Sequence, residues 1–299
     1  MTSYAFVHLE FGNAHRDRSL KVLKALHAQL AGPGDTSMLV VVDNKQGTVA
    51  DVSEPDFSTS IAIAGDNGNR EFTGWDVGVA AVRAQAAEPD VWVFSNDTIA
   101  LHHGWSQSRT ARFAAEMRRL VGHGGPWLFG EIKEFPRSIA TPFAPVLEFV
   151  QSYFFAMNGA LREAMETLSP DQALLDAQVQ PAFEPARRLF RGDVDKTFDA
   201  LTSTWLLNDD PEATRRNSWT HAWHKAEPLS TANFDDLRMK ARCCLSELLL
   251  TARARRLGAD LRSPYDARTT RAHLQRSLQM IADKLWERRY LRQLGRSRV

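Results

Sequence analysis

The sequence contains very little cysteine: among 299 residues only Cys243 and Cys244 occur, and they are adjacent. On a helix the side chains of neighbouring residues diverge, which argues against a disulfide and against a tetrahedral zinc site. The sequence also lacks an uninterrupted apolar run of about 18 residues, the length needed to span a membrane. Met1-Thr2-Ser3-Tyr4 has no basic region leading into an apolar segment, so we expect no secretory signal. These absences predict a cytoplasmic protein.

An excess of one charge is also missing, because 37 Lys and Arg face 36 Asp and Glu and the formal net charge is +1. This balance gives no general case for nucleic-acid binding. No Gly-x-Gly-x-x-Gly follows the first apolar run, which counts against a dinucleotide-binding enzyme. The hydrophobic fraction of 43% and the charged fraction of 24% are typical of a globular protein with a substantial core.

Short apolar runs and helical stripes alternate along the first half of the chain. Strand-like runs occupy residues 4–9, 38–42, 60–64, 91–94 and 127–132. Helical stripes follow at residues 17–30, from Gly74 onward and through Leu120. This alternation predicts an α/β fold with a mainly parallel, doubly wound sheet flanked by helices.

The second half is predicted to be largely helical. Residues 146–157 are apolar and fit either a helix or a strand, whereas no strand signal remains after about residue 195. Apolar residues from Leu237 to Ala252 recur at helical spacing. We therefore predict a sheet domain over residues 1–195 and an α-helical C-terminal region over residues 196–299.

Two of the predicted strands end in polar residues. The run 91–94 is followed by Ser95-Asn96-Asp97-Thr98, and the run 38–42 is followed by Asp43-Asn44. In open α/β sheets the ligand crevice lies beyond the carboxyl ends of the strands, which makes these residues candidates for a site. The same residues are also good turn and N-cap residues, and the local pattern leaves both interpretations open.

The order of these segments resembles the N-terminal half of a GT-A-type glycosyltransferase, closest to the family-2-like and rhamnan-synthesis-F-like proteins of bacterial surface polysaccharide assembly. The resemblance covers roughly residues 4–165 and is carried by Val40-Val41-Val42-Asp43-Asn44, Asn67-Gly68, Gly74-Trp75-Asp76-Val77-Gly78, Val93-Phe94-Ser95-Asn96-Asp97-Thr98 and Gln151-Ser152-Tyr153-Phe154-Phe155. It implies a GT-A-like, Rossmann-like fold and a nucleotide-sugar donor. The residues that it places at the nucleotide sugar are Asp43, Asn44, Asn67, Gly74, Asp76, Ser95 and Asn96.

The resemblance also implies a divalent metal ion, Mg²⁺ or Mn²⁺, held on the diphosphate by Asp97. A hard cation bound by carboxylate oxygen screens the two phosphate charges as the donor binds and as its glycosidic bond breaks. The usual Asp-x-Asp motif is here Ser95-Asn96-Asp97, so the first carboxylate is missing. His102 and His103, or His221 and His224, are further candidates near the metal, although a single histidine is more often a surface or packing residue.

An inverting transferase needs a general base that removes the proton of the acceptor hydroxyl. By resemblance to family-2 enzymes, Asp193 and Asp195 have the approximate location for this role, with Glu184 behind them. The alternative is that each carboxylate is a helix cap that interacts with the helix dipole.

The last 32 residues form a basic amphipathic segment. Residues 268–299 contain nine Lys or Arg against Asp283 and Glu287, a local charge of 9 − 2 = +7. Such a helix either docks on an anionic inner membrane face or packs on its own domain with a solvated basic face, and the sequence leaves both interpretations open. No aromatic-interleaved basic sheet accompanies the charge, so we do not expect nucleic acid as a partner.

Together these features predict a bacterial cell-envelope enzyme, an inverting hexosyl or rhamnosyl transferase that moves a sugar to a growing polysaccharide or another glycan or lipid-linked acceptor. The alternative is a non-catalytic nucleotide-sugar-binding or scaffold protein of the same fold, which the incomplete Asp-x-Asp motif supports.

Overall fold

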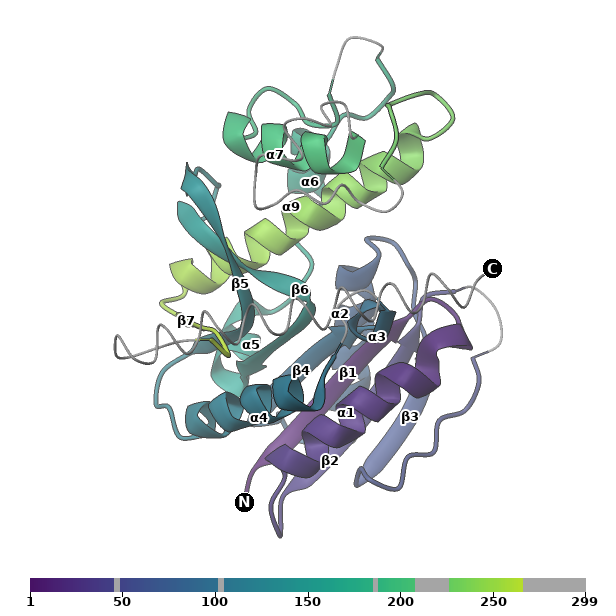
Figure 1. The fold of residues 1–299 in the computed structure, drawn as a ribbon, viewed down its shortest axis with the longest axis vertical. Coiled ribbons are helices and arrows are strands. Elements are labelled where there is room, and N and C mark those ends of the chain that lie inside the picture. Colours follow the sequence, from purple (N-terminus) through teal and green to yellow (C-terminus); the bar gives the residue numbers. More distant parts are fainter. Residues whose placement is uncertain (46–48, 102–104, 185–187, 208–225, 266–299) are drawn as a thin grey trace.

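The computed structural model describes residues 1–45, 49–101, 105–184, 188–207 and 226–265. In this part the centre is a seven-stranded sheet with the order β3-β2-β1-β4-β6-β5-β7 (Figure 1). Its strands are β1 (Ser3–Glu10), β2 (Thr36–Asp43), β3 (Thr59–Ala64), β4 (Val91–Asn96), β5 (Trp127–Ile139), β6 (Val146–Asn158) and β7 (Asp260–Arg262). Strand β6 runs antiparallel to its neighbours β4 and β5, and the other described pairs are parallel. The predicted α/β class with a mainly parallel, Rossmann-like sheet is confirmed.

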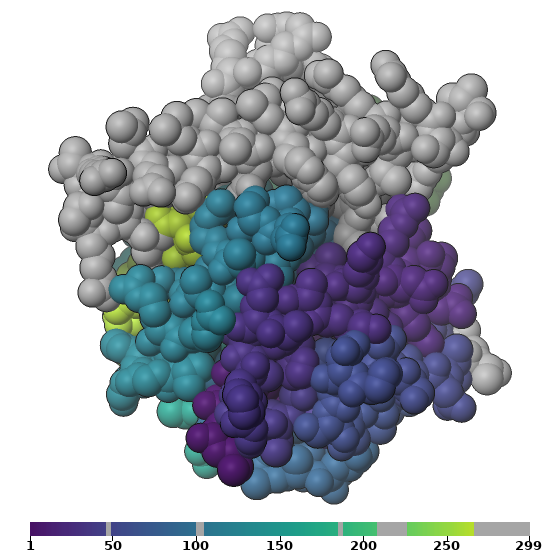
Figure 2. Space-filling model, turned by 60° about the horizontal axis from the view of Figure 1, so that its bottom comes forward, coloured from purple at the N-terminus to yellow at the C-terminus, as the bar shows by residue number. Residues whose placement is uncertain are grey.

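Helices cover both faces of the sheet. On one face lie α1 (Arg16–Leu30), preceded by the 3₁₀ turn η1 (Asn13–His15), together with α3 (Thr98–Leu101) and α4 (Gln107–Val121). On the other face lie α2 (Glu71–Gln85), α5 (Gly159–Met165) and part of α9 (Phe234–Arg256). Figure 2 shows the purple segment that contains α1 beside the teal segment that contains α4.

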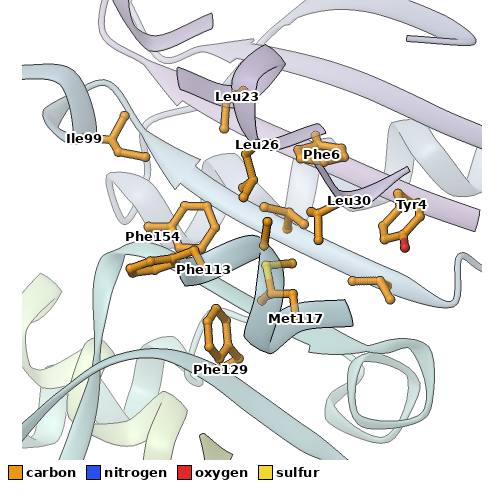
Figure 3. Close-up of a cluster of buried hydrophobic side chains, with 14 of the residues drawn as sticks. Tyr4, Phe6, Leu23, Leu26, Leu30, Ile99, Phe113, Met117, Phe129 and Phe154 are labelled. Atoms are coloured by element: carbon orange, nitrogen blue, oxygen red, sulfur yellow. The ribbon is translucent and has the colours of Figure 1, made fainter. Parts of the chain in front are cut away.

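Successive side chains of the central strands point to opposite faces, which gives two buried layers. In β1, Tyr4 and Phe6 face α1 and α4, whereas Ala5 and Val7 face α2. Figure 3 shows the first layer, in which Leu23 and Leu26 of α1 meet aromatic and sulfur-containing residues of the sheet and of α4. Because both faces are covered, the parallel strands are continuous apolar runs, and this is why the sequence predicted them well.

A third core lies beyond the sheet, between the far end of the β5–β6 hairpin and the helices α6 (Gln172–Gln178), α7 (Lys196–Leu207) and α9 (Figure 1). It contains Phe135 and Phe149 from the hairpin, Phe198 from α7 and Leu245 from α9. This core includes residues on both sides of position 195, so the predicted domain boundary is not a break in packing.

Three details differ from the sequence predictions or resolve them. The ambiguous segment 146–157 is strand, because β6 pairs with both β4 and β5. The prediction of no strand after residue 195 was wrong, since β7 pairs with β5 at the sheet edge. Helix α2 begins at Glu71, three residues before the predicted Gly74.

No helix in the described part of the chain is both long and apolar enough to cross a membrane.

Candidate functional site

The carboxyl ends of β2, β1 and β4 lie side by side, and together we call them the carboxyl edge. Glu10, the last residue of β1, pairs with Asp43 of β2, and Leu9 pairs with Asn96 of β4. The chain proceeds from β1 outward through β2 to β3 and then returns to the opposite side of β1 with β4. This reversal is a topological switch point, where open α/β sheets bind ligands. Asp43 and Asp97 therefore flank β1, two strand spacings or about 10 Å apart.

The loop after β1 is held between these two carboxylates. Asp43 Oδ1 accepts hydrogen bonds from the backbone N–H groups of Gly12 and Lys45, both at 2.8 Å. Asp97 Oδ2 accepts a longer bond of 3.4 Å from the N–H of Phe11. Gly12 has φ of +80°, a conformation that glycine adopts without strain. The loop thus turns outward at the switch point with its backbone fixed from both sides.

Phe11 extends from this loop into solvent with 62% of its surface exposed. Large apolar side chains with this exposure are few among the described residues, and this one lies beside Asp97. An exposed aromatic ring gives a flat apolar surface on which a planar ring or a sugar can stack. We did not predict Phe11 from the sequence; the signal that was present is an aromatic residue followed by glycine directly after the first strand.

Asp97 is half-buried and is surrounded by other acids. Burial raises the pKa of Asp97 above its ordinary value, and the carboxylates of Glu71 and Glu10 raise it further, while the Phe11 N–H and His15 act in the opposite direction. Glu10 is fully buried and is paired with Arg16, which binds both of its carboxylate oxygens. Arg16 is thus used by Glu10, and among the described residues no cationic side chain is bound directly to Asp97.

The metal prediction rests on Asp97 alone. Within the described ranges no three His, Cys, Asp or Glu side chains are arranged to hold one metal ion. His102, His103, His221 and His224 lie outside the described residues. A hard cation at Asp97 would take its remaining oxygen ligands from the substrate and water, as Mg²⁺ commonly does.

Ser95 and Asn96, predicted to contact the nucleotide sugar, use their side chains inside the protein. The Ser95 hydroxyl lies 2.9 Å from Nδ1 of His8 in the core. Asn96 Oδ1 accepts from the backbone N–H of Thr98 at 3.2 Å and from the Thr98 hydroxyl, and so fixes the turn into α3. Both side chains thus have partners inside the protein, and their contact with a nucleotide sugar stays a prediction.

Gly74 and Asp76 are likewise engaged in packing rather than exposed at the edge. A Cβ atom on Gly74 would lie 2.1 Å from Cδ1 of Leu9, so glycine allows α2 to approach β1. The two Asp76 oxygens accept from the N–H groups of Leu168 and Ser169 at 2.6 and 2.9 Å, which ties α2 to the loop after α5. Their contact with the nucleotide stays a prediction.

Asn44 and Asn67 lie near the carboxyl edge. Asn44 is buried and donates from Nδ2 to the carbonyl of Arg70 at 2.7 Å, which joins the end of β2 to the start of α2. Its Oδ1 has no hydrogen-bond partner among the described residues. Asn67 is half-buried in the turn after β3 with φ of +52°, which lies in the left-handed region.

Two of the three predicted general bases, Asp193 and Asp195, lie far from Asp97. Asp195 Oδ1 accepts from the N–H of Thr197 at 2.8 Å and caps α7, and Oδ2 accepts from the N–H of Ala140 at 3.2 Å. Ala140 follows Ile139, which pairs with Val146 at the end of the hairpin. The pairing of Ser95 with Phe154 places Asp97 near the level of Ser152, six residues along β6 from Val146. At about 3.3 Å per residue the separation is roughly 20 Å.

A cavity of about 250 Å³ lies at this far end of the hairpin, and Asp193 and Asp195 are among its lining residues. Although burial raises the pKa of Asp195, the N–H groups of Thr197, Ala140 and Phe198 lower it more, so this carboxylate is a stabilised cap. Asp193 and Glu184 are exposed. The structure does not bring Asp193 and Asp195 together with Asp97, so this geometry gives no support to their predicted role in the same reaction.

No family model matches the chain, and no curated protein is similar to it at a significant level. The fold and the carboxyl edge are therefore the basis of the functional argument.

Proposed function

We propose that the protein is a GT-A-like glycosyltransferase that uses a nucleotide-sugar donor at the carboxyl edge, assisted by Mg²⁺ or Mn²⁺, and that acts on a glycan or lipid-linked acceptor. The single observation that carries this proposal is the placement of Asp43 and Asp97 on either side of the exposed Phe11-Gly12 loop, at the switch point of the sheet. A reducing, cytoplasmic location fits the two free cysteines.

Each residue at the edge has a distinct part in this proposal. The Phe11 ring stacks on the base or on the sugar. Asp43 uses Oδ1 for the loop, and its Oδ2, which accepts no hydrogen bond from a described residue, receives one from the base or from a ribose hydroxyl. Asp97 holds the metal ion, which neutralises charge on the leaving diphosphate.

This proposal does not use Asp193 or Asp195 as the general base. A base has to lie within hydrogen-bond reach of the acceptor hydroxyl, and the reacting atoms have to approach to about 3–3.5 Å. Since Asp193 and Asp195 are roughly 20 Å from Asp97 by the strand spacing, we remove them from the reaction.

Titration calorimetry with UDP, GDP and dTDP and their sugars, with and without Mn²⁺, tests the proposal. We expect one nucleotide to bind more tightly with Mn²⁺, and we expect the matching nucleotide sugar to be hydrolysed or transferred. Binding without any release of the nucleoside diphosphate would favour the non-catalytic alternative, for which the single carboxylate of Ser95-Asn96-Asp97 is the supporting observation. A complete lack of binding would contradict both.

A further inference from the structure

Helix α9 runs from the core beyond the sheet to the face of the sheet that α2 covers, and it passes the carboxyl edge on the way (Figure 1). Ser246 Oγ accepts from Nδ2 of Asn69 at 3.1 Å, next to the start of α2. The next residue, Glu247, accepts from the N–H of Ser152, and about one turn further along the helix Thr251 Oγ1 accepts from the N–H of Val150 at 3.0 Å. These bonds fix α9 against β6 at the level of Asp97.

One stripe of α9 carries polar side chains toward this edge. Asp236, Lys240, Cys243 and Glu247 follow one another at intervals of three or four residues, which places them on one helix face. Asp236 forms an ion pair with Arg70 at 3.8 Å, and the pKa of Glu71, at the start of α2, is influenced by both Lys240 and Cys243. The stripe therefore faces the acids of the edge.

Lys240 is the cation of this stripe, and its ammonium group is not used in a close ion pair within the described part of the chain. The side chain is half-buried, and Nζ lies 5.9 Å from the ring centre of Trp205 in α7. Burial alone would lower the pKa of Lys240, but the negative charges of Glu71 and Glu247 keep it raised. The ammonium group is therefore charged at neutral pH, and the carboxylates of Glu71 and Glu247 stabilise its charge without a close ion pair.

The negative charge of Glu71, at the start of α2, raises the pKa of both Asp97 and Lys240. The edge collects Glu10, Asp43, Glu71 and Asp97, and only Glu10 has a bound cation, Arg16, among the described residues. A diphosphate that enters such a site is repelled unless positive charge faces it. One carboxylate at the end of β4 gives the metal ion a weak hold, so a protein cation is needed as well.

We propose that Lys240 binds the phosphate oxygens of the ligand's diphosphate from the α9 side, opposite Asp97. The identity of the ligand as a nucleoside diphosphate rests on the proposed function, whereas the anion site itself rests on the placement of Lys240. Its three N–H groups can contact more than one phosphate oxygen.

The test measures the affinity of the full-length protein for UDP, GDP, dTDP and inorganic pyrophosphate in the presence of EDTA, so that only protein cations contribute. We expect Lys240→Ala and Lys240→Gln to weaken binding of the best nucleoside diphosphate and of pyrophosphate by about ten- to a hundredfold. Binding of the matching nucleoside, which has no phosphate, should be unchanged. Lys240→Arg should retain most of the affinity. Lys21→Ala, an exposed lysine on α1, is the matched control and should behave as the wild type.

The outcomes separate the two proposals. If the wild type binds a nucleoside diphosphate and both Lys240 variants bind it equally well, the inference fails and the proposed function stands. If the variants lose affinity for the nucleoside and for the nucleoside diphosphate to the same extent, Lys240 has only a structural role and the inference fails. Binding of pyrophosphate that depends on Lys240, without binding of any nucleotide, supports the anion site and contradicts the proposed function. If neither class of ligand binds in EDTA, the inference fails, and the titrations with Mn²⁺ alone decide the proposed function. Because Lys240→Gln keeps the stem of the side chain, it provides the result if the alanine variant does not fold.

Discussion

Asp97 and Asp195 are the same residue type in two regions with opposite surroundings. Asp97, at the carboxyl edge, accepts one long hydrogen bond of 3.4 Å and lies near other acids that raise its pKa. Asp195, at the end of the β5–β6 hairpin, caps α7, and the N–H groups around it lower its pKa. A carboxylate that is poorly satisfied in a folded protein indicates a ligand, whereas a fully satisfied one indicates structure.

The comparison is tested most strongly by Asp97→Ala. We expect it to reduce Mn²⁺-dependent binding of the nucleotide sugar, and any hydrolysis, by at least about a hundredfold, because the metal ion loses its protein carboxylate. Asp193→Ala, which removes an exposed acid in the other region, should leave both properties unchanged. Calorimetry and a product assay make the measurement, and full retention of both by Asp97→Ala would remove its proposed role.

The next largest effect is expected from Phe11→Ala. Loss of a stacking ring should weaken nucleotide-sugar affinity by about tenfold or more, since one stacked base contributes about 1–3 kcal/mol. The control is Leu147→Ala, an apolar residue near the end of the hairpin that is also exposed, at 54%. Equal affinities of the two variants would show that the exposure of Phe11 has another reason.

Asp195→Ala should affect stability and leave ligand binding intact. Loss of the cap on α7 should lower the free energy of unfolding by about 1 kcal/mol. Chemical denaturation measures this change, and the nucleotide affinity measured in parallel should match the wild type. A large loss of affinity or activity in this variant would return Asp195 to the candidate site.

The smallest expected effect is on folding stability: Asp97→Asn and Asp195→Asn should change the free energy of unfolding at neutral pH in opposite directions. The raised pKa of Asp97 means that its ionised form disfavours folding, so stability falls as pH rises from the ordinary value through the raised one. Removing that charge should stabilise the protein at neutral pH. The lowered pKa of Asp195 contributes stability above its ordinary pKa that is lost as the pH falls through the lowered value, so its removal should destabilise the protein at neutral pH. Melting temperatures at pH 7 and pH 3 check both signs.

The sequence predicted the strands of the sheet because β1, β2 and β4 are buried on both faces and consist of apolar runs. It also predicted that Asp43 and Asp97 share an edge, since parallel strands place their carboxyl ends together. Strand β7 was missed because three residues carry no periodic pattern, and its position is set by pairing with β5, far away in the sequence.

The side-chain roles were harder to predict because they depend on distant partners. Asp76 has the sequence context of a nucleotide-binding residue, but its oxygens bind backbone groups 92 and 93 residues away. Asp195 precedes a helix as a base or a cap would, and only its distance from Asp97 separates the two hypotheses. Lys240 lies in an amphipathic helix more than 140 residues after β4, so the local pattern gave no reason to connect it with the edge.

Helix α9 contributes Leu250 and Ala254 to the core under the sheet, and Leu245 and Leu248 to the core beyond it. A fragment that stops at residue 195 would lack these side chains in both cores, and it would expose the edge of β5 that β7 covers. The sheet region and the helical region are therefore expected to melt in one cooperative transition, and neither is expected to survive proteolytic separation from the other.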